Sequence, residues 1–279
     1  MSETTPFTLE VAPGTAIHGV VDLPEASGPR PAVIICHGFK GFMDWGFFPY
    51  LAALLAARGF TVIRFNFSGS GMEPGGDRAT DLEGFRESSF SGDLRDLLAV
   101  LEAAPSLAPG RVNPQRLGLI GHSRGGGCAL LGSAHETWQG RIRALVTWAS
   151  VSTFDRFGEE IKSTWRRTGE ILVPNSRTGQ QLPLGLATLN DVEENREALD
   201  LAAAAGRRRA PWLILHGSED ETVPVAEAKA LEAAAADPAV LEILTGAGHT
   251  FDCRHPFAGP TPALTTAMNH TQTWFRRHL

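Results

Sequence analysis

The feature that most constrains the fold is a series of short, continuous apolar runs that alternate with segments of helical spacing. PAVIICHG (31–38) shows such a run best, and TVIRFNF (61–67) is predicted as a second buried strand. Uninterrupted apolar runs of this length are typical of strands that are buried on both faces. Further strands are predicted at 116–123, 141–150, 210–217 and 239–246.

Segments with helical spacing follow most of these runs, and they lie at about 47–60, 89–104, 124–135, 225–236 and 262–278. Strands that alternate with helices imply a mostly parallel central sheet with helices on both faces. Residues 7–22 instead alternate in the manner of a short antiparallel pair, broken at APGT. The predicted fold class is therefore α/β.

The segment 152–208 interrupts this alternation. It is longer than a normal connection between a strand and a helix, and it carries apolar and aromatic residues that must be buried. We predict that this segment is an inserted cap, or lid, which covers a substrate pocket at the edge of the sheet. Trp165 would then contact the substrate. The core domain would then consist of 1–151 and 209–279. The alternative is a segment that packs on the flank of the sheet.

Composition excludes several classes of function. The net charge is −6 and the pI about 5.9, whereas a nucleic-acid-binding protein usually has a basic face. No apolar run approaches the ~18 residues that a membrane helix needs. Three cysteines without a CxxC pair fit a reducing compartment, and the N-terminal sequence predicts no signal peptide, so we expect a cytoplasmic protein. The oligomeric state is not predicted.

Residues 121–125 read GHSRG and fit G-x-S-x-G between a predicted strand and a predicted helix. In this context the serine occupies a sharp turn that exposes its hydroxyl, and the glycines leave room for neighbouring elements. The helix that follows directs its N-terminus at the site, where developing negative charge is favoured. Ser123 is therefore the predicted nucleophile, and a glycine-rich turn with an incidental serine is the alternative.

A serine nucleophile needs a base, and there are nine histidines. His249 is placed best, in a loop of small residues after the last predicted strand. That loop lies at the carboxyl edge of the sheet, where sites in open α/β folds collect. His255 is the alternative base. His122 adjoins the serine, but we expect it to point away from it.

The base needs a carboxylate to orient it. HGSEDETVP (216–224) follows the fifth predicted strand, and Asp220 suits a loop that turns back toward the next helix. Asp155, after the fourth strand, is the main competitor. The chain order Ser123, Asp220, His249 is the Ser…Asp…His order of the α/β-hydrolase arrangement.

Backbone N–H groups are the usual means of stabilising negative charge on a substrate oxygen. One predicted donor is the N–H of Arg124, directly after the serine. The other is the N–H of Phe39, in the glycine-containing loop that follows the first buried strand.

These motifs together resemble the α/β-hydrolase superfamily. The matching pieces are HGFKG (37–41), RFNFSGSG (64–71), GHSRGG (121–126), HGSEDETVP (216–224) and GAGHTF (246–251). The chain resembles most the branch of dienelactone hydrolases and prolyl oligopeptidases, and the small cinnamoyl or feruloyl esterases with an inserted lid. The resemblance implies a serine esterase whose roles fall on Ser123, Asp220, His249, Phe39 and Arg124. Dienelactone hydrolases, by contrast, carry a cysteine nucleophile.

The expected activity is hydrolysis of a small-molecule carboxylic ester through an acyl-enzyme. A peptidase or amidase and an acyltransferase are alternatives on the same residues, and a non-catalytic binding module is a further one. No metal and no cofactor are predicted. HETW (135–138) lacks the second histidine of HExxH, and Pro74 replaces the last glycine of G-x-G-x-x-G.

Overall fold

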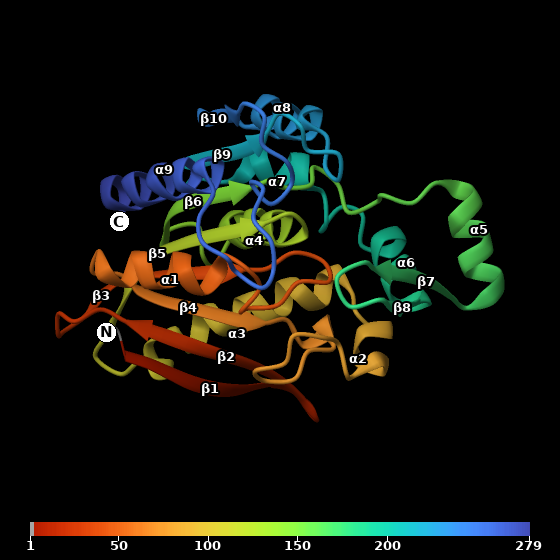
Figure 1. Cartoon of the computed structure of the whole chain (residues 1–279), viewed down its shortest axis with the longest axis horizontal. Coiled ribbons are helices and arrows are strands. Elements are labelled where there is room, and N and C mark those ends of the chain that lie inside the picture. The colour runs from red at the N-terminus through yellow and green to blue at the C-terminus, as the bar shows by residue number, and fades with distance from the viewer. Residues whose placement is uncertain (1–2) are drawn as a thin grey trace.

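A single eight-stranded sheet forms the centre of the molecule, in a computed structural model that describes residues 3–279 (Figure 1). The strand order is β1-β2-β4-β3-β5-β6-β9-β10. β1 pairs antiparallel with β2, and β2 antiparallel with β4, while the other neighbours are parallel. The strands are β1 (Glu3–Ala12), β2 (Thr15–Leu23), β3 (Arg30–Cys36), β4 (Thr61–Asn66), β5 (Val112–His122), β6 (Ile142–Trp148), β9 (Trp212–Gly217) and β10 (Ala239–Leu244).

Helices cover both faces of the sheet, as the alternation predicts. α1 (Phe48–Ala57) and α9 (Pro262–His278) pack on one face. The opposite face is covered by α3 (Phe90–Leu107), α4 (Arg124–Ala134), α7 (Leu201–Arg207) and α8 (Val225–Ala234). Alternate residues of β3 enter the two cores: Ala32 and Ile34 face α3 and α4, and Val33 and Ile35 face α1. Continuous apolar runs are thus explained by burial on both sides.

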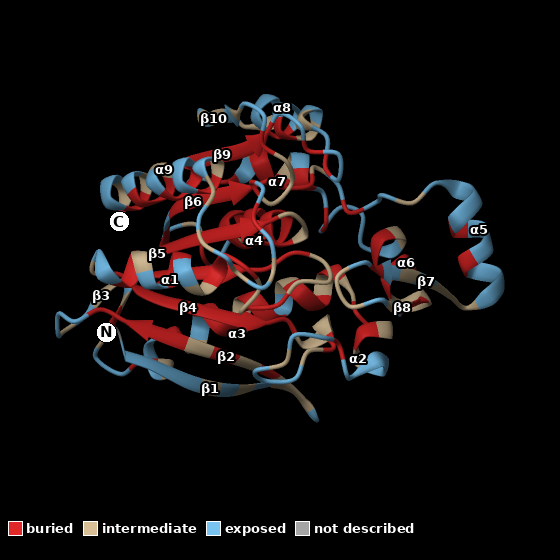
Figure 2. Cartoon of the chain, in the orientation of Figure 1, coloured by how far each residue is buried: buried red, intermediate tan, exposed pale blue. Residues whose placement is uncertain are grey.

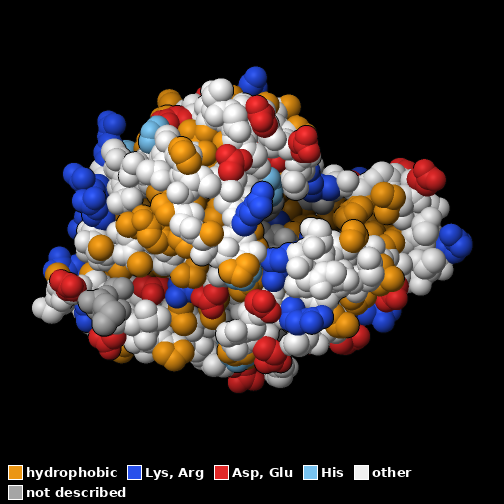
Figure 3. Space-filling model, viewed as in Figure 1, with side chains coloured by type: hydrophobic (Ala, Val, Ile, Leu, Met, Phe, Trp, Pro, Cys, Tyr) orange, Lys and Arg blue, Asp and Glu red, His pale blue; other side chains and the backbone are white. Residues whose placement is uncertain are grey.

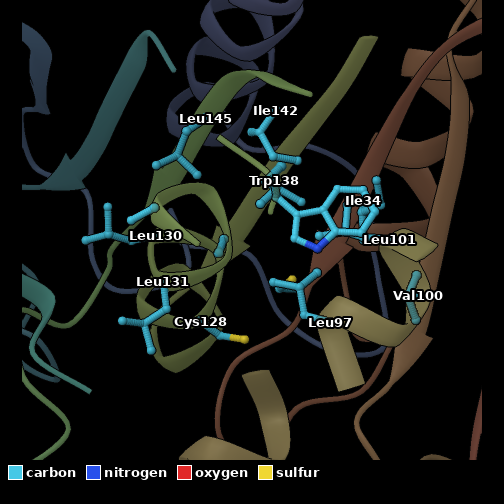
Figure 4. Close-up of a cluster of buried hydrophobic side chains, with 14 of the residues drawn as sticks. Ile34, Leu97, Val100, Leu101, Cys128, Leu130, Leu131, Trp138, Ile142 and Leu145 are labelled. Carbon is cyan, nitrogen blue, oxygen red and sulfur yellow. The ribbon is translucent and has the colours of Figure 1, made fainter. Parts of the chain in front are cut away.

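The larger of the two cores lies between the sheet and the α3–α4 layer. Figure 4 shows Leu97 and Leu101 of α3 beside Cys128 of α4 and Ile34 of β3, and all of these side chains are buried. Removing one such leucine side chain typically costs about 2–5 kcal/mol. Figure 2 shows the inner strands β3, β4, β6 and β9 as mostly buried, whereas the edge strands β1 and β10 and the outer helices carry exposed residues. This packing makes the sheet a rigid base for the loops at its edge.

The segment after β6 forms a separate unit, which we call the insertion unit. It contains α5 (Glu159–Thr168), the antiparallel hairpin β7 (Glu170–Asn175) and β8 (Gln180–Gly185), and α6 (Leu186–Glu194). The hairpin was not predicted. The unit lies at the side of the sheet toward which the arrowheads of β5, β6 and β9 point (Figure 1). No helix within residues 3–279 is long and apolar enough to cross a membrane.

The insertion unit has its own small hydrophobic core. The buried members of this cluster are Ala79, Phe85, Trp165, Leu182, Leu184 and Leu189. Ala79 and Phe85 come from the connection between β4 and α3, which contains a 3₁₀ turn (Ser68–Ser70) and α2 (Leu82–Arg86). α7 also falls within the predicted segment 152–208, but its buried residues join the main core. The separately packed part is therefore shorter than predicted, because α7 buries its apolar face against α4 and α8.

Hydrogen bonds across long sequence separations attach the insertion unit to the rest of the chain. The carboxylate of Asp191 accepts from the N–H groups of Phe90 and Ser91 at 2.7 and 2.9 Å. It thereby caps the N-terminus of α3, where a negative charge is favoured. Thr188 donates to the carbonyl of Ser88 at 2.5 Å, and Gln180 to that of Ala79 at 2.7 Å.

Candidate active site

Ser123 stands alone between β5 and α4, in a backbone conformation that few side chains adopt. Its φ is 56° and its ψ −123°. Residues held in such regions cost of order 1–3 kcal/mol, and they persist only where the surroundings impose them. Here the N–H of Ser123 donates to the carbonyl of Trp148 in the adjacent strand at 2.9 Å. The serine therefore occupies a sharp, tethered turn between strand and helix.

The glycines on either side of the serine are required by close backbone packing. A Cβ placed on Gly121 would lie 2.0 Å from the carbonyl oxygen of Gly125. A Cβ on Gly125 would lie 2.4 Å from the carbonyl oxygen of Cys36. Both distances are far inside van der Waals contact, so the G-x-S-x-G spacing reflects the tightness of the turn.

His249 and Asp220, which lie on different loops, are joined by a hydrogen bond. Nδ1 of His249 is 2.8 Å from Oδ2 of Asp220. The other carboxylate oxygen of Asp220 accepts from the N–H groups of Thr222 and Val223 at 2.9 and 2.8 Å. The two loops are also joined through their backbones, because the N–H of Glu219 donates to the carbonyl of Ala247 at 3.0 Å.

The environment keeps Asp220 ionised. Burial by itself raises the pKa of Asp220, but hydrogen bonds from His216, His249 and the Val223 N–H outweigh it and hold the pKa well below its usual range. An ionised carboxylate only accepts hydrogen bonds, so Nδ1 of His249 must carry the proton that it donates. In a neutral ring, Nε2 is then left with a free lone pair.

Two further histidines, to which the sequence analysis assigned no role in the site, support this pair. Nε2 of His216 lies 3.3 Å from Oδ2 of Asp220 and 2.7 Å from the carbonyl oxygen of Val223. Nε2 of His122 lies 2.9 Å from the carbonyl oxygen of His249, and therefore donates to it. Burial, together with the neighbouring His249 ring, lowers the pKa of His122 to about 3, so the ring stays neutral. One indication of these roles was present in the sequence, because both histidines lie at the ends of predicted strands. His122 adjoins Ser123, and His216 begins HGSED.

The loop after β3 holds Gly38 and Phe39 beside the serine turn. The carbonyl of Gly38 accepts from Nδ1 of His37 at 2.9 Å and from the N–H of Gly41 at 3.0 Å. In a trans peptide the N–H points opposite to the carbonyl, so the Phe39 N–H faces away from both donors. Gly38 itself is adjacent to the serine, because a Cβ added to it would lie 3.1 Å from Cβ of Ser123.

Arg124, whose N–H is the other predicted donor, is the first residue of α4. The first N–H groups of a helix have no acceptor within it. The Arg124 N–H directly follows the serine and is therefore available at the turn. The guanidinium of Arg124 is used elsewhere, since Nε donates to Oδ2 of Asp93 at 2.6 Å.

The competing residues lie in other surroundings. The carboxylate of Asp155 is 2.6 Å from Nζ of Lys162 in α5, and nothing joins it to a histidine among the described residues. His255 lines the same cavity as Ser123, but its Nδ1 accepts from the N–H of Gly46 at 3.0 Å. The structure thus brings Asp220, rather than Asp155, to His249.

Ser123 and His249 line one cavity of about 770 Å³ between the edge of the sheet and the insertion unit. Figure 3 shows it as a hollow beside the projecting part of the molecule. The wall supplied by the insertion unit and the segment before it includes Phe157, Asn175, Ser176, Arg177, Leu184 and Thr188. Phe39 and Arg124 also line the cavity.

Trp165 does not line this cavity, contrary to the prediction. Its side chain is 1% exposed and packs against the ring of Phe157 within the core of the insertion unit. The indole is on the inner face of α5, so it stabilises the unit instead of facing the hollow. Phe157, which touches both Trp165 and the cavity, occupies the place expected for the tryptophan.

Comparison with known proteins decides the family. A model of the family described as alpha/beta hydrolase fold matches residues 31–191, more than half of the chain. The chain belongs to this family. The match contains the Phe39 loop and the Ser123 turn, while Asp220 and His249 follow it in the sequence.

One curated relative is the 2,6-dihydropseudooxynicotine hydrolase of Paenarthrobacter nicotinovorans, which is 26% identical to this α/β-hydrolase over 221 residues. The match covers 76% of this chain and 50% of that protein. The chain is also 25% identical over 175 residues to an uncharacterized 31.7 kDa protein of the traX-finO intergenic region of Escherichia coli, covering 63% and 51%. The chain thus spans about half the length of the curated relatives it matches.

Two solved structures show the same fold over nearly the whole chain. Est1E from Butyrivibrio proteoclasticus superposes with a TM-score of 0.69 at 18% identity, covering 98% of both chains. The acylaminoacyl peptidase of Pyrococcus horikoshii superposes with a TM-score of 0.73 at 18% identity, covering 100% of this chain and 42% of that one. At such identities the likeness extends to the α/β-hydrolase fold alone.

Proposed function

We propose that the protein hydrolyses small-molecule carboxylic esters through an acyl-enzyme on Ser123. The observation that carries the proposal is the 2.8 Å hydrogen bond from His249 to an ionised Asp220, at the wall of a cavity that His249 and Ser123 both line. This arrangement leaves Nε2 of His249 able to accept a proton. The tethered, strained serine turn is the second support, because strain of this kind clusters at functional sites.

In the proposed reaction, Oγ of Ser123 attacks the ester carbonyl carbon while Nε2 of His249 takes the hydroxyl proton. The N–H groups of Phe39 and Arg124 stabilise the negative oxygen of the tetrahedral intermediate. Collapse breaks the bond to the alcohol, which leaves with the proton from His249. Water then attacks the acyl-enzyme and loses a proton to His249, which passes it to Oγ of Ser123 as the bond between the acyl group and Oγ breaks and the carboxylic acid leaves. Asp220 stabilises the imidazolium at each stage.

Cleavage of an amide by the same residues is the second candidate. An acylaminoacyl peptidase is among the proteins of similar fold, and the esterase domain of a Rhodothermus marinus protein is another. The difference between the two reactions lies in the leaving group, because an amine must be protonated as it departs whereas an alkoxide is a better leaving group. Parallel assays with 4-nitrophenyl butyrate and with aminoacyl 4-nitroanilides separate the two activities.

The test is the variant Ser123→Ala. We expect it to fold with an unchanged circular dichroism spectrum and to lose ester hydrolysis almost completely. In a comparable triad, loss of the serine cost about 10⁶-fold in kcat. Wild-type protein should also be labelled by a fluorophosphonate probe at Ser123, as shown by mass spectrometry of the modified peptide. An alanine variant that keeps more than a few per cent of the activity would refute the proposal.

A further inference from the structure

The cavity beside Ser123 is lined by cationic side chains and, within residues 3–279, by no carboxylate. The charged residues of its wall are Lys40, Arg124, Arg156, Arg177 and Arg254. The chain as a whole carries a net charge of −6, so this imbalance is local. Figure 3 shows Lys and Arg side chains beside the hollow. An excess of one charge in a recess attracts ligands of the opposite charge.

Two of these cations are neutralised within the protein. Nε of Arg124 is 2.6 Å from Oδ2 of Asp93, which is itself buried. Nη1 of Arg156 is 2.7 Å from Oε1 of Glu227. These arginines have carboxylate partners already, and they add little net attraction for an anion in the cavity.

Lys40, Arg177 and Arg254 form no salt bridge within the part of the chain that the structure describes. Nη2 of Arg177 is buried and has no hydrogen-bond partner there, while the guanidinium lies 5.1 Å from the centre of the Phe42 ring. Asp77, on an exposed turn, acts on Arg177 only through space. A buried, unpaired guanidinium nitrogen costs free energy unless a ligand satisfies it.

Lys40 is held in an unusual way. Its φ is 57°, in the left-handed region that glycine and asparagine adopt more readily than lysine. It follows Phe39 directly, and its Nζ donates to the carbonyl of Pro174 in β7 at 2.8 Å. An ammonium group has three protons, so further hydrogen bonds from Nζ remain possible. Lys40 is thus joined to the end of β7, directly before the β7–β8 loop that carries Arg177.

We propose that the substrate is an ester that carries a second, ionised carboxylate, which binds to Lys40 and Arg177, with Arg254 at the exposed rim. The inference rests on the proposed function, because it places the ester carbonyl at Ser123. Phe48, Phe90 and Phe154 of the cavity wall would contact the hydrocarbon between the two groups. Charge-assisted hydrogen bonds are the strong ones in such sites, which makes this end of the cavity a determinant of selectivity.

Matched pairs of esters test the proposal by kinetics. The mono-4-nitrophenyl esters of adipic and suberic acid differ from 4-nitrophenyl hexanoate and octanoate by a carboxylate in place of the terminal methyl group. We expect kcat/KM to be about tenfold or more higher for the carboxylate member of at least one pair, given the strength of charge-assisted hydrogen bonds. The preference should fall in 0.5 M NaCl, since salt screens the attraction.

Substitutions locate the effect. Lys40→Gln and Arg177→Gln should each bring the ratio of kcat/KM for the carboxylate ester to that for the methyl ester toward one. Arg167→Gln, on the exposed surface of α5 and outside the cavity wall, is the matched control and should leave the ratio as in the wild type. An equal fall for Arg167→Gln would assign the preference to overall charge and would overturn the proposal.

Binding separates this inference from the proposed function. Calorimetric titration of Ser123→Ala with free suberate should show binding that Arg177→Gln, added to the same background, weakens about tenfold. If neutral esters are hydrolysed but no carboxylate ester is preferred and suberate does not bind, the anion site is refuted and the esterase stands. If suberate binds as described but no ester is cleaved, the proposed function fails and the anion site stands.

Discussion

The two sides of the cavity differ in how they are built. On the sheet side, the Ser123 turn and the loops of Asp220 and His249 are held by backbone hydrogen bonds to neighbouring strands and to one another. On the other side, the insertion unit has a small hydrophobic core of its own and presents Phe157, Arg177 and Leu184 to the hollow. The polar groups of the first side are fixed in orientation, whereas those of the second include a cation without a partner among the described residues.

Under the proposed function, this difference predicts that the sheet side carries out the reaction and the insertion unit selects the substrate. Groups that must transfer a proton need defined tautomers and fixed positions, which a rigid sheet edge provides. Groups that select a substrate need only the right shape and charge, and a separately packed unit can change these without disturbing the sheet. Each prediction below tests whether the two sides are separable in this way.

The largest effect should come from the carboxylate on the sheet side. Asp220→Asn keeps an acceptor for the Thr222 and Val223 N–H groups but can present an amide to His249, which then favours the wrong tautomer. We expect kcat for 4-nitrophenyl butyrate to fall about 10⁴-fold, as in a comparable triad. Asp155→Asn, which alters a contact with Lys162 in the insertion unit, should change kcat by no more than a few-fold. Reversed magnitudes would place the acid after β6.

The next effect concerns the core of the insertion unit. Trp165→Ala should lower the free energy of unfolding of this unit by about 3–5 kcal/mol, because a large buried side chain is lost. Trp165→Phe is the matched control and should cost less, since the indole N–H has no partner within residues 3–279. Hydrogen exchange, measured by mass spectrometry, should show lost protection in 159–194 and unchanged protection in β3 and β5. A change of ester selectivity without any loss of protection would instead place Trp165 in the pocket wall.

Acid should act on the sheet side. Burial lowers the pKa of His37 to about 4 and that of His122 to about 3, against an ordinary value of 6.5. Below pH 6.5 the unfolded chain therefore binds more protons than the folded one, and the free energy of unfolding decreases as the pH falls toward 4. Asp93 opposes this trend. Burial raises the pKa of Asp93 to about 6, so below pH 6 the folded chain binds a proton there that the unfolded chain does not, and this group increases the free energy of unfolding as the pH falls.

The variant His37→Gln isolates this contribution. Glutamine can accept from the Phe67 N–H and donate to the Gly38 carbonyl, as His37 does, but it does not titrate in this range. The loss of unfolding free energy between pH 7 and pH 4 should be smaller than in the wild type by about 3 kcal/mol. Urea unfolding followed by tryptophan fluorescence at each pH measures it. Segment 152–208 contains no histidine and cannot account for a histidine titration. If the free energy of unfolding depends on pH in His37→Gln as it does in the wild type, His37 does not cause the acid sensitivity.

The smallest effect should be a change of selectivity. Phe157→Ala enlarges the cavity on the side of the insertion unit, and the ratio of kcat/KM for bulky to short esters should rise about tenfold, within the range of one apolar pocket contact. Leu172→Ala, at a 58% exposed position on β7, is the matched control and should leave the ratio unchanged. A uniform loss for all esters with Phe157→Ala would mean that the ring only stabilises the insertion unit through its contact with Trp165.

Much of the fold was predictable because its signals are local. Strands buried on both faces require consecutive apolar residues, and helices require a repeat of 3.6, so β3 to β6 and the helices around them could be located from short windows. The hairpin β7–β8 was missed. EILVPN places a proline within the strand and QQLPLG another, which weakens a strand prediction, and both prolines are tolerated because the hairpin is a separate two-stranded sheet outside the main one.

Residues at the sheet edge were predictable for a related reason. Ser123, Asp220 and His249 each follow a strand, and parallel strands bring their carboxyl ends to one edge. The supporting roles of His122 and His216 were not predictable, since both depend on where a ring nitrogen lies relative to a loop far away in sequence. The choice between Asp220 and Asp155 also required the relative placement of two loops.

The sequence by itself determined the alternation of strands and helices, the sharp turn at Ser123 and the order of the polar residues, because each of these follows from local spacing and steric demand. Only the tertiary structure decided what faces the cavity. Trp165 turns inward and Phe157 outward, and Lys40 meets Pro174 across 134 residues. The directions of such side chains depend on how the insertion unit docks, which is a balance of many long-range contacts that no short window of sequence contains.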